Sequence, residues 1–314
     1  MSETNGNSKS RLHGLWALTN RELKKWYKAP VIFLLSIIQP ILWMGLLGKA
    51  MNVGAIFTGT SFMTPDLVGR LQQSLLQRGM PQGQVPLFMG DLGNIFSGLG
   101  NSVMTDAFNT TDYFSYMAVG MIAFTALFTT MFSGMSVVWD RRLGFLNKVL
   151  STPVSRAVII SSKVLSATLR SMFQAGLIIA IAVAFGLQFG PNFNLLNILG
   201  VFAIMFLICV GLSSVFIAIT IRSTRIETPM AVVNLINLPL MFASNAFFPT
   251  KFMPDWLQAI AKVNPLTYTT DAVRQLLIFN TDWAQLAVDF TYVGVFAAVA
   301  STIGIVMSWR FLTK

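Results

Sequence analysis

The sequence predicts an all-α integral membrane protein with six transmembrane helices. Hydrophobic residues make up 54% of the 314 residues and charged residues only 11%, whereas soluble domains carry charge at about a quarter of their positions. The apolar residues form six long runs, and about 20 such residues in a helix cross the roughly 30 Å hydrocarbon layer. The single cysteine, Cys209, excludes an internal disulfide framework.

The first segment, 1–30, is expected to be a cytoplasmic N-terminus that contains an amphipathic interfacial helix. Residues 1–10 are polar, and we expect no regular structure there. Over 11–28, Trp and Leu side chains share one helical arc and Arg and Lys side chains the other. That pattern is typical of a helix that lies in the membrane interface. An ordinary helix packed on a soluble partner is the alternative.

The six spans and the segments between them follow in order along the chain. The polar segment 49–112 contains Gly-rich turns and a short amphipathic piece, Leu67 to Leu76. Its length favours a packed outer domain, because structureless loops that long are uncommon. The expected spans are 31–48, 113–138, 164–189, 195–221, 229–248 and 285–309, with 139–163 and 249–284 as the other long connections and 310–314 as the tail.

The positive charges predict the orientation. With six spans both termini lie on one side, and that side holds 16 of the 22 Lys and Arg residues. Cytoplasmic segments are enriched in Lys and Arg, so both termini are expected in the cytoplasm, as in a multi-pass protein of the cell (plasma) membrane. The six outer cations are Lys49, Arg70, Arg78, Lys251, Lys262 and Arg274.

A basic segment between the second and third spans is a candidate for passing on motion. Residues 139–156 read WDRRLGFLNKVLSTPVSR. Leu143, Leu146, Val149 and Leu150 give the segment a helical apolar stripe, and Pro153 ends it. A short helix of this kind can dock into a moving partner and transmit its displacement. A solvated positively charged loop is the alternative, and physics alone does not separate the two.

Two motifs, one on each side of the membrane, carry a resemblance to a known family. The first is Asp-Arg-x-x-Gly-Phe-Leu followed by Thr-Pro-Val-Ser-Arg, within 139–156. The second is the Pro-x-Trp-Leu and Asn-Pro-Leu-Thr-Tyr pattern within 236–277. Both motifs resemble those of the type-2 ABC exporter permeases, and the nearest branch looks like the daunorubicin-resistance-like permeases. The amphipathic N-terminal helix is a third, looser match. The resemblance covers nearly the whole chain except 49–112.

The resemblance implies that 139–156 is a cytoplasmic coupling helix that contacts a separate ATPase. Arg142 and the Asn147-Lys148 pair depart from the family pattern toward a more basic surface. We therefore expect a complementary acidic groove on the partner. The residues expected to couple this chain to the ATPase are Asp140, Arg141, Gly144, Pro153, Ser155 and Arg156, together with Arg21 and Glu22 of the N-terminal helix.

The outer segment 249–284 is expected to form a re-entrant helical hairpin. Asp255 is a candidate N-cap for a first helix, and a second helix is expected to begin near Thr267 after the Asn264-Pro265 turn. Helices too short to span suggest a hairpin that dips into the outer leaflet. By the resemblance, such a hairpin covers the translocation path.

Polar and aromatic residues within the first, second and fifth spans are candidates for the path. Polar groups in hydrocarbon must be paired or face a wet cavity. Pairing between helices is the alternative role, especially for Ser and Thr. Asp289, near the outer end of the sixth span, is expected to reach water. The path candidates are Gln39, Trp43, Thr125, Thr129, Asn234, Asn237, Phe242, Asn245 and Phe247.

The chain lacks the motifs of an enzyme. Gly48-Lys49 ends a span and has no phosphate-binding loop around it, and His13 is the only histidine. No catalytic, metal or cofactor residues are expected, and ATP and Mg belong to the partner ATPase. The sequence thus predicts the permease of an ATP-driven exporter that acts as a homodimer on a hydrophobic or amphipathic substrate. The alternatives are an ion-coupled secondary transporter or channel, and a membrane scaffold that binds a partner through 49–112.

Overall fold

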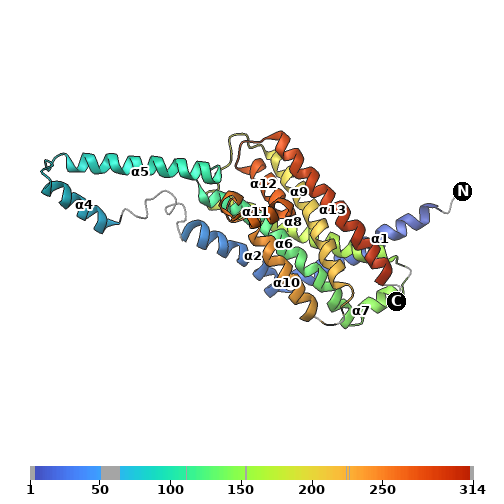
Figure 1. Cartoon of the computed structure of the whole chain (residues 1–314). Coiled ribbons are helices and arrows are strands. Elements are labelled where there is room, and N and C mark those ends of the chain that lie inside the picture. The colour runs from blue at the N-terminus through green and yellow to red at the C-terminus, as the bar shows by residue number, and fades with distance from the viewer. Residues whose placement is uncertain are drawn as a thin grey trace.

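The computed structural model describes residues 4–50, 64–110, 112–152, 154–223, 225 and 227–311, and every regular element in these ranges is a helix. Figure 1 shows a bundle of long helices with a two-helix arm that extends from one end. We call that end the arm end and the opposite one the α7 end. The elements are α1 (Thr4–Tyr27), α2 (Pro30–Trp43), the π-helix η1 (Met44–Ala50), α4 (Pro65–Gln77), α5 (Val85–Phe108), α6 (Tyr113–Arg142), α7 (Phe145–Leu150), α8 (Arg156–Ala184), α9 (Leu195–Thr220), α10 (Glu227–Phe242), the 3-10 helix η3 (Thr250–Phe252), α11 (Asp255–Val263), α12 (Pro265–Leu277) and α13 (Trp283–Phe311).

Helix α6 is the centre of the bundle. It packs against α8 and α9, and α13 lies along α9. Every side chain from Tyr113 to Leu127 is buried. At Gly134 a Cβ atom would lie only 2.7 Å from the carbonyl oxygen of Phe216 on α9. Small residues let membrane helices approach this closely, so the packing of α6 on α9 depends on glycine at this position.

Five helical stretches of the described chain are long and apolar enough to cross a membrane. They overlap five of the six spans that the sequence predicts. Helix α10 covers most of the remaining span, 229–248, but it has 16 residues, whereas a spanning helix needs about 17–25. The six-span arrangement therefore stays a prediction. The five stretches are Phe33–Ala50, Val85–Arg142, Arg156–Ala184, Leu195–Thr220 and Trp283–Met307.

Helix α10 ends at Phe242, before the end of the predicted span, because the backbone leaves the helical conformation there. Pro239 lies in its last turn and cannot donate a backbone hydrogen bond. The Asn264 amide donates to the carbonyl oxygens of Leu240 at 2.8 Å and Ala243 at 2.7 Å. Asn264 therefore satisfies two carbonyl groups that the broken helix leaves without partners.

Arg274 of α12 fixes the segment that follows the break. Its side chain is 1% exposed, and it donates to the carbonyl oxygens of Asn245 at 2.7 Å and Ala246 at 2.9 Å. The guanidinium carbon lies 3.4 Å from the centre of the Tyr116 ring of α6. The Ala246 carbonyl oxygen lies so close to Gly120 that a Cβ there would be 2.0 Å away. Arg274 and Gly120 together hold the broken segment against α6.

The segment expected to be a re-entrant hairpin contains η3, α11 and α12. Pro254, not Asp255, is the N-cap of α11, and Asp255 is the first helical residue. A carboxylate in the first turn is stabilised by the helix dipole. Helix α12 begins at Pro265, and the Asn264 side chain accepts a hydrogen bond from Leu266 N at 3.0 Å. Asparagine as the cap and proline directly after it are the preferred start of a helix.

The arm corrects the expectation of a packed outer domain for the described residues 64–110. Helix α4 contains the predicted amphipathic piece, and α5 runs over 24 residues where the sequence suggested turns. Few side chains of α5 are buried, and the arm extends away from the bundle (Figure 1). Scattered glycines such as Gly90 and Gly93 lower helix propensity by about 1 kcal/mol each but do not end a helix.

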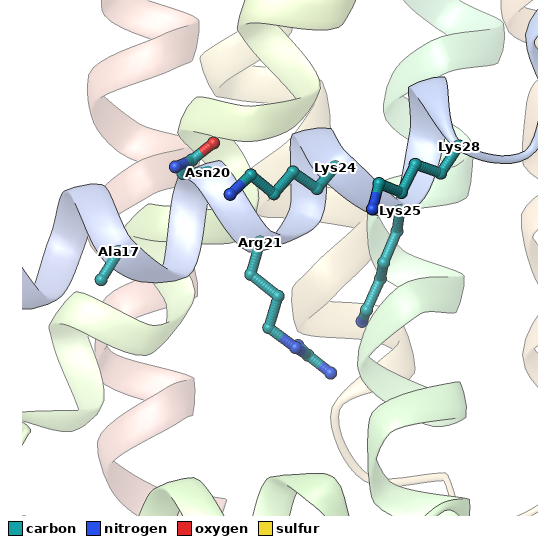
Figure 2. Close-up of a pocket in the computed structure, with 6 residues that line it drawn as sticks. All are labelled: Ala17, Asn20, Arg21, Lys24, Lys25 and Lys28. Atoms are coloured by element: carbon teal, nitrogen blue, oxygen red, sulfur yellow. The ribbon is translucent and has the colours of Figure 1, made fainter.

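Helix α1 begins at Thr4, earlier than expected from the polar residues 1–10. Once a packed helix has formed, adding residues to its end is much easier than starting a new helix. The helix packs against α8 and contacts the beginning of α2. It crosses the direction of the bundle helices at the α7 end, as Figure 2 shows.

Candidate functional site

Helix α7 is a six-residue helix between the ends of α6 and α8. It begins after Gly144, whose φ of +69° lies in the left-handed region that glycine adopts without strain. Leu146 and Val149 are buried in a small apolar cluster with residues of α6, α8 and α9. Leu143 is 74% exposed. The predicted apolar stripe is therefore divided. Leu146 and Val149 fix α7 to the bundle, whereas Leu143 lies on the surface.

Helix α1 contacts α7 through a stacked cation. The guanidinium carbon of Arg21 lies 3.2 Å from the centre of the Phe145 ring, the first residue of α7. Lys25 Nζ lies 5.7 Å from the same centre. Figure 2 shows both basic side chains pointing from the same side of α1. A displacement of α7 would therefore act directly on α1.

A cluster of five charged side chains lies beside this contact. We call it the charge cluster; it consists of Arg21, Glu22 and Lys25 of α1, Asp140 of α6 and Lys163 of α8. Lys163 Nζ is 2.6 Å from Asp140 Oδ2 and 3.4 Å from Glu22 Oε1. Lys25 Nζ is 2.9 Å from Asp140 Oδ1 and 3.0 Å from Glu22 Oε1. Glu22, Asp140 and Lys163 are all buried.

The charge cluster joins three helices at one point. Burying a charge is unfavourable unless an opposite charge compensates it. Lys163 also donates to the hydroxyl of Ser136 at 3.1 Å, which gives its ammonium a third side-chain partner. Separating α1, α6 and α8 at this point would leave buried charges unpaired.

The other predicted coupling residues lie around α7 but outside the charge cluster. Arg141 Nη1 donates to the carbonyl oxygen of Ser223, in the connection between α9 and α10, at 3.4 Å. Ser155 is the N-cap of α8 and is exposed, and Arg156 is the first residue of α8. Pro153 lies outside the described residues. The structure thus gathers Arg21, Glu22 and Asp140 in one cluster and distributes the remaining residues over the surrounding turns.

Three of the predicted path residues form an aromatic cluster, with Phe247 at its centre. The ring of Trp43 lies 6.0 Å from that of Phe247, and the Phe242 ring lies 6.4 Å away. Phe124 of α6 adds a fourth ring at 5.6 Å. Trp43 and Phe242 are exposed, whereas Phe247 is buried. The cluster brings together the ends of α2 and α10 and the middle of α6.

The predicted polar path residues divide into exposed and buried groups. Asn234 is exposed on α10, and Gln39 is half-buried on α2. Asn237 is buried, and its amide lies 3.5 Å from the sulfur of Met131. The side-chain oxygens of Asn237 and Asn245 are buried without a hydrogen-bond partner. Buried polar atoms are usually paired, so these two oxygens stand out within the described part of the bundle.

Two predicted path residues point into the bundle instead. The Thr125 hydroxyl donates to the carbonyl oxygen of Met121 in the same helix at 2.8 Å. The Thr129 hydroxyl donates to the side-chain oxygen of Gln174 on α8. Both threonines are buried and paired, but only Thr129, whose partner lies on α8, fits the alternative role of joining helices. They do not join the aromatic cluster.

Sequence reasoning missed several residues whose signal was misleading. Lys25 and Lys163 were counted only as cytoplasmic charges, yet both belong to the charge cluster. Arg274 was counted as an outer charge, yet it is buried against backbone carbonyls. Asp289 was expected to reach water, but it is fully buried and accepts hydrogen bonds from Gln275 at 3.2 Å. For Arg274 and Asp289, a charge within an otherwise apolar helical segment was the available signal.

The chain is similar in sequence to known transport permeases. A family model described as ABC-2 type transporter matches residues 13–278. The chain is similar to the putative transport permease ycf38 of Cyanophora paradoxa, with 28% identity over 271 residues that cover 86% of this chain and 75% of the relative. It is also similar to the protein of the same name from Porphyra purpurea, with 33% identity over 192 residues that cover 60% of this chain.

Two further relatives carry more specific names. The daunorubicin resistance ABC transporter permease protein DrrB1 of Streptomyces coeruleorubidus is 22% identical over 169 residues, 54% of this chain and 59% of the relative. The probable multidrug ABC transporter permease YbhR of Escherichia coli K12 is 24% identical over 192 residues, 57% of this chain and 50% of the relative. The chain spans 64% of the length of the Porphyra relative and about half to three fifths of the other two.

Proposed function

Because the chain belongs to the ABC-2 type transporter family, we propose that it is the permease subunit of an ATP-driven exporter. Two copies form the translocation path in the membrane, and a separate ABC ATPase subunit binds ATP and Mg and supplies the energy. This chain carries no catalytic residues of its own. Binding of ATP closes the two ATPase subunits, which displaces the two α7 helices and opens the path outward.

The observation that carries the coupling role is the contact between α7 and the charge cluster. Phe145 of α7 stacks under Arg21, and Arg21 lies 2.9 Å from Glu22 and 3.5 Å from Asp140. A force on α7 therefore reaches the ends of α1, α6 and α8 through contacts that cannot stretch without separating buried charges. Leu143 and the basic residues around it remain exposed for the ATPase.

The aromatic cluster supports a path between two copies of the chain. Trp43 and Phe242 are exposed and both contact the buried ring of Phe247, and Asn234 is exposed on the same helix as Phe242. A second copy placed against α2 and α10 covers this face and encloses the rings. Aromatic walls with few polar groups suit a hydrophobic or amphipathic substrate such as a drug-like molecule, a lipid or a lipid-linked glycan. Among these, the names of the Streptomyces and Escherichia relatives favour a drug-like molecule.

The orientation follows from the distribution of Lys and Arg. The α7 end faces the cytoplasm, both termini lie there, and the arm extends outside the cell membrane. The ATPase then meets α7 from the cytoplasm.

The test is ATP hydrolysis by the candidate partner ATPase in lipid vesicles, with and without this chain. The chain is expected to bind the ATPase and change its rate. The variant Phe145→Ala is expected to reduce that change roughly two- to fivefold, the range of a partly exposed cation–π contact. Phe88→Ala, on the exposed surface of α5, is the matched control and is expected to behave as wild type.

Absence of binding between the two proteins would argue against the coupled exporter. One observation then favours the ion-coupled alternative, because Asp289 is a buried carboxylate in a spanning helix, held by Gln275 and Gln285. In that case transport should follow an ion gradient without any ATPase. In an ion-coupled transporter, the variant Asp289→Asn should abolish transport driven by the ion gradient. In an ATP-driven exporter, the same variant should still transport when ATP is supplied, with no ion gradient required.

A further inference from the structure

Helix α1 carries a basic groove, and Lys24 and Lys28 of this groove take no part in the coupling role. The groove has a volume of about 340 Å³ and lies over one side of the helix (Figure 2). Arg21 and Lys25 point from the groove toward the charge cluster, whereas Lys24 and Lys28 form no ion pair within the part of the chain that the structure describes. The groove is lined by Ala17, Asn20, Arg21, Lys24, Lys25 and Lys28.

The groove has a surplus of positive charge. In the charge cluster three cations face two carboxylates, which leaves a net charge of +1. Lys24 and Lys28 are exposed next to it and raise the local charge to +3. They are four residues apart, so their ammonium groups leave α1 on the same side, one turn from each other. Two exposed ammonium groups at this spacing attract an anion that both can contact, such as a phosphate group.

The neighbouring face of α1 indicates where that anion comes from. Leu12, Trp16 and Tyr27 are exposed and form an apolar strip along the helix. At 100° per residue this strip is adjacent to the row of Asn20, Lys24 and Lys28. Helix α1 also lies across the bundle helices (Figure 2), which places it along a membrane surface. The apolar strip then enters the acyl region and the lysines lie at the level of the headgroups.

We propose that this groove binds the phosphate of an anionic phospholipid headgroup from the leaflet at the α7 end. Lys24 and Lys28 donate to the phosphate oxygens, and the Asn20 amide is a third donor on the same row. An acidic segment of a protein partner would satisfy the lysines but would leave the apolar strip beside them exposed. The lipid covers both surfaces at once, and its binding does not depend on the ATPase.

The test titrates the purified full chain with phosphatidylglycerol and, separately, with phosphatidylcholine, and counts bound lipids by native mass spectrometry. The wild-type chain is expected to bind phosphatidylglycerol preferentially. The double variant Lys24→Gln, Lys28→Gln is expected to lose affinity about fivefold for each lysine removed. The variant Lys24→Arg, Lys28→Arg keeps the charge and is expected to keep the preference, which separates loss of the site from loss of the fold.

The matched control removes two cations from the arm, in the variant Arg70→Gln, Arg78→Gln. It changes the net charge equally and is expected to keep the preference. The proposal is overturned if the Lys24 and Lys28 variant with Gln binds phosphatidylglycerol as wild type does, or if the arm control weakens binding as much. It is also overturned if the Gln variant loses only ATPase binding, since the groove would then be a protein contact. Competition by soluble glycerol phosphate as strong as by the lipid would likewise overturn the lipid assignment.

Discussion

Lys163 is the residue on which the charge cluster depends, because it contacts both carboxylates from inside the bundle. The variant Lys163→Met leaves Asp140 and Glu22 with fewer compensating charges in a buried place. We expect it to lower the free energy of unfolding by about 3 kcal/mol. The exposed pair of Arg70 and Asp66 is the control, since Arg70→Met should change it by less than about 0.5 kcal/mol. Unfolding in lipid or detergent measures both, and equal losses would contradict the assigned burial.

Arg21 and Phe145 can be tested as a pair. If their stacking transmits the movement of α7, the effects of Arg21→Ala and Phe145→Ala on the ATPase rate should not add. The expected interaction energy is about 0.5–1 kcal/mol in a double-mutant cycle, because Arg21 is partly exposed. Additive effects would mean that the two residues act independently and that α7 reaches the bundle by another route.

Single residues were the least predictable from the sequence. The resemblance pointed to Asp140, Arg21 and Glu22, and the structure places these three together. Lys163 was not singled out, because its partners lie 23 and 141 positions away in the chain. No local periodicity connects residues so far apart. The same limit explains why Arg274 was taken for a surface charge.

Among the elements, α7 depends on the conformation of one residue. Gly144 has a positive φ, and a Cβ atom added there would have no neighbour within 4 Å, so a side chain would be strained without any collision. We expect Gly144→Ala to cost about 1 kcal/mol and to weaken ATPase coupling. Gly69 in α4 also has free space but a helical backbone. Gly69→Ala should stabilise the arm by up to about 1 kcal/mol and leave coupling intact.

The segment after α10 depends on a close approach instead. A Cβ atom at Gly120 would meet the Ala246 carbonyl oxygen at 2.0 Å, so Gly120→Ala must push this segment away from α6. Overpacking of this kind costs about 1–3 kcal/mol. We expect transport to fall sharply in Gly120→Ala vesicles. Gly98→Ala on α5, where nothing lies within 4 Å, is the control, and the same loss there would exclude the close approach as the cause.

The helices differ in how well the sequence predicted them. Long apolar runs predicted α6, α8, α9 and α13, because a run of that length has one stable arrangement in a membrane. The end of α10 at Phe242 was not predicted, since the carbonyl oxygens in and after its last turn accept hydrogen bonds from the distant side chains of Asn264 and Arg274. Helix α5 was missed because its glycines were taken as turns.

For the whole molecule, the proposed dimer gives a direct prediction. Leu235 is exposed on α10, on the face that a second copy covers, and Val299 is exposed on α13. A Leu235→Cys variant should form a disulfide between two chains in the membrane, whereas Val299→Cys should not. The native Cys209 is buried and should not react in either case. Cross-linking through Val299 but not Leu235 would place the dimer interface on the other side of the bundle.

The overall architecture was predictable in class but not in shape. Composition and the apolar runs predicted a helical membrane protein, which the family match and the five spanning stretches support. The same observations contain nothing about how far a segment extends from the membrane. The outer segment was expected to be compact because compact segments are common, and the described part of it is extended.

The arm also has a practical consequence. Helix α5 has 24 residues, and at 1.5 Å per residue it extends about 36 Å. The turn between α4 and α5, near Gly79, is exposed and far from the bundle (Figure 1). Exposed loop tips tolerate insertions, so a short epitope placed there should leave the bundle undisturbed. An antibody added to intact cells would bind that epitope if the arm end faces outward, and only after permeabilisation if it faces the cytosol.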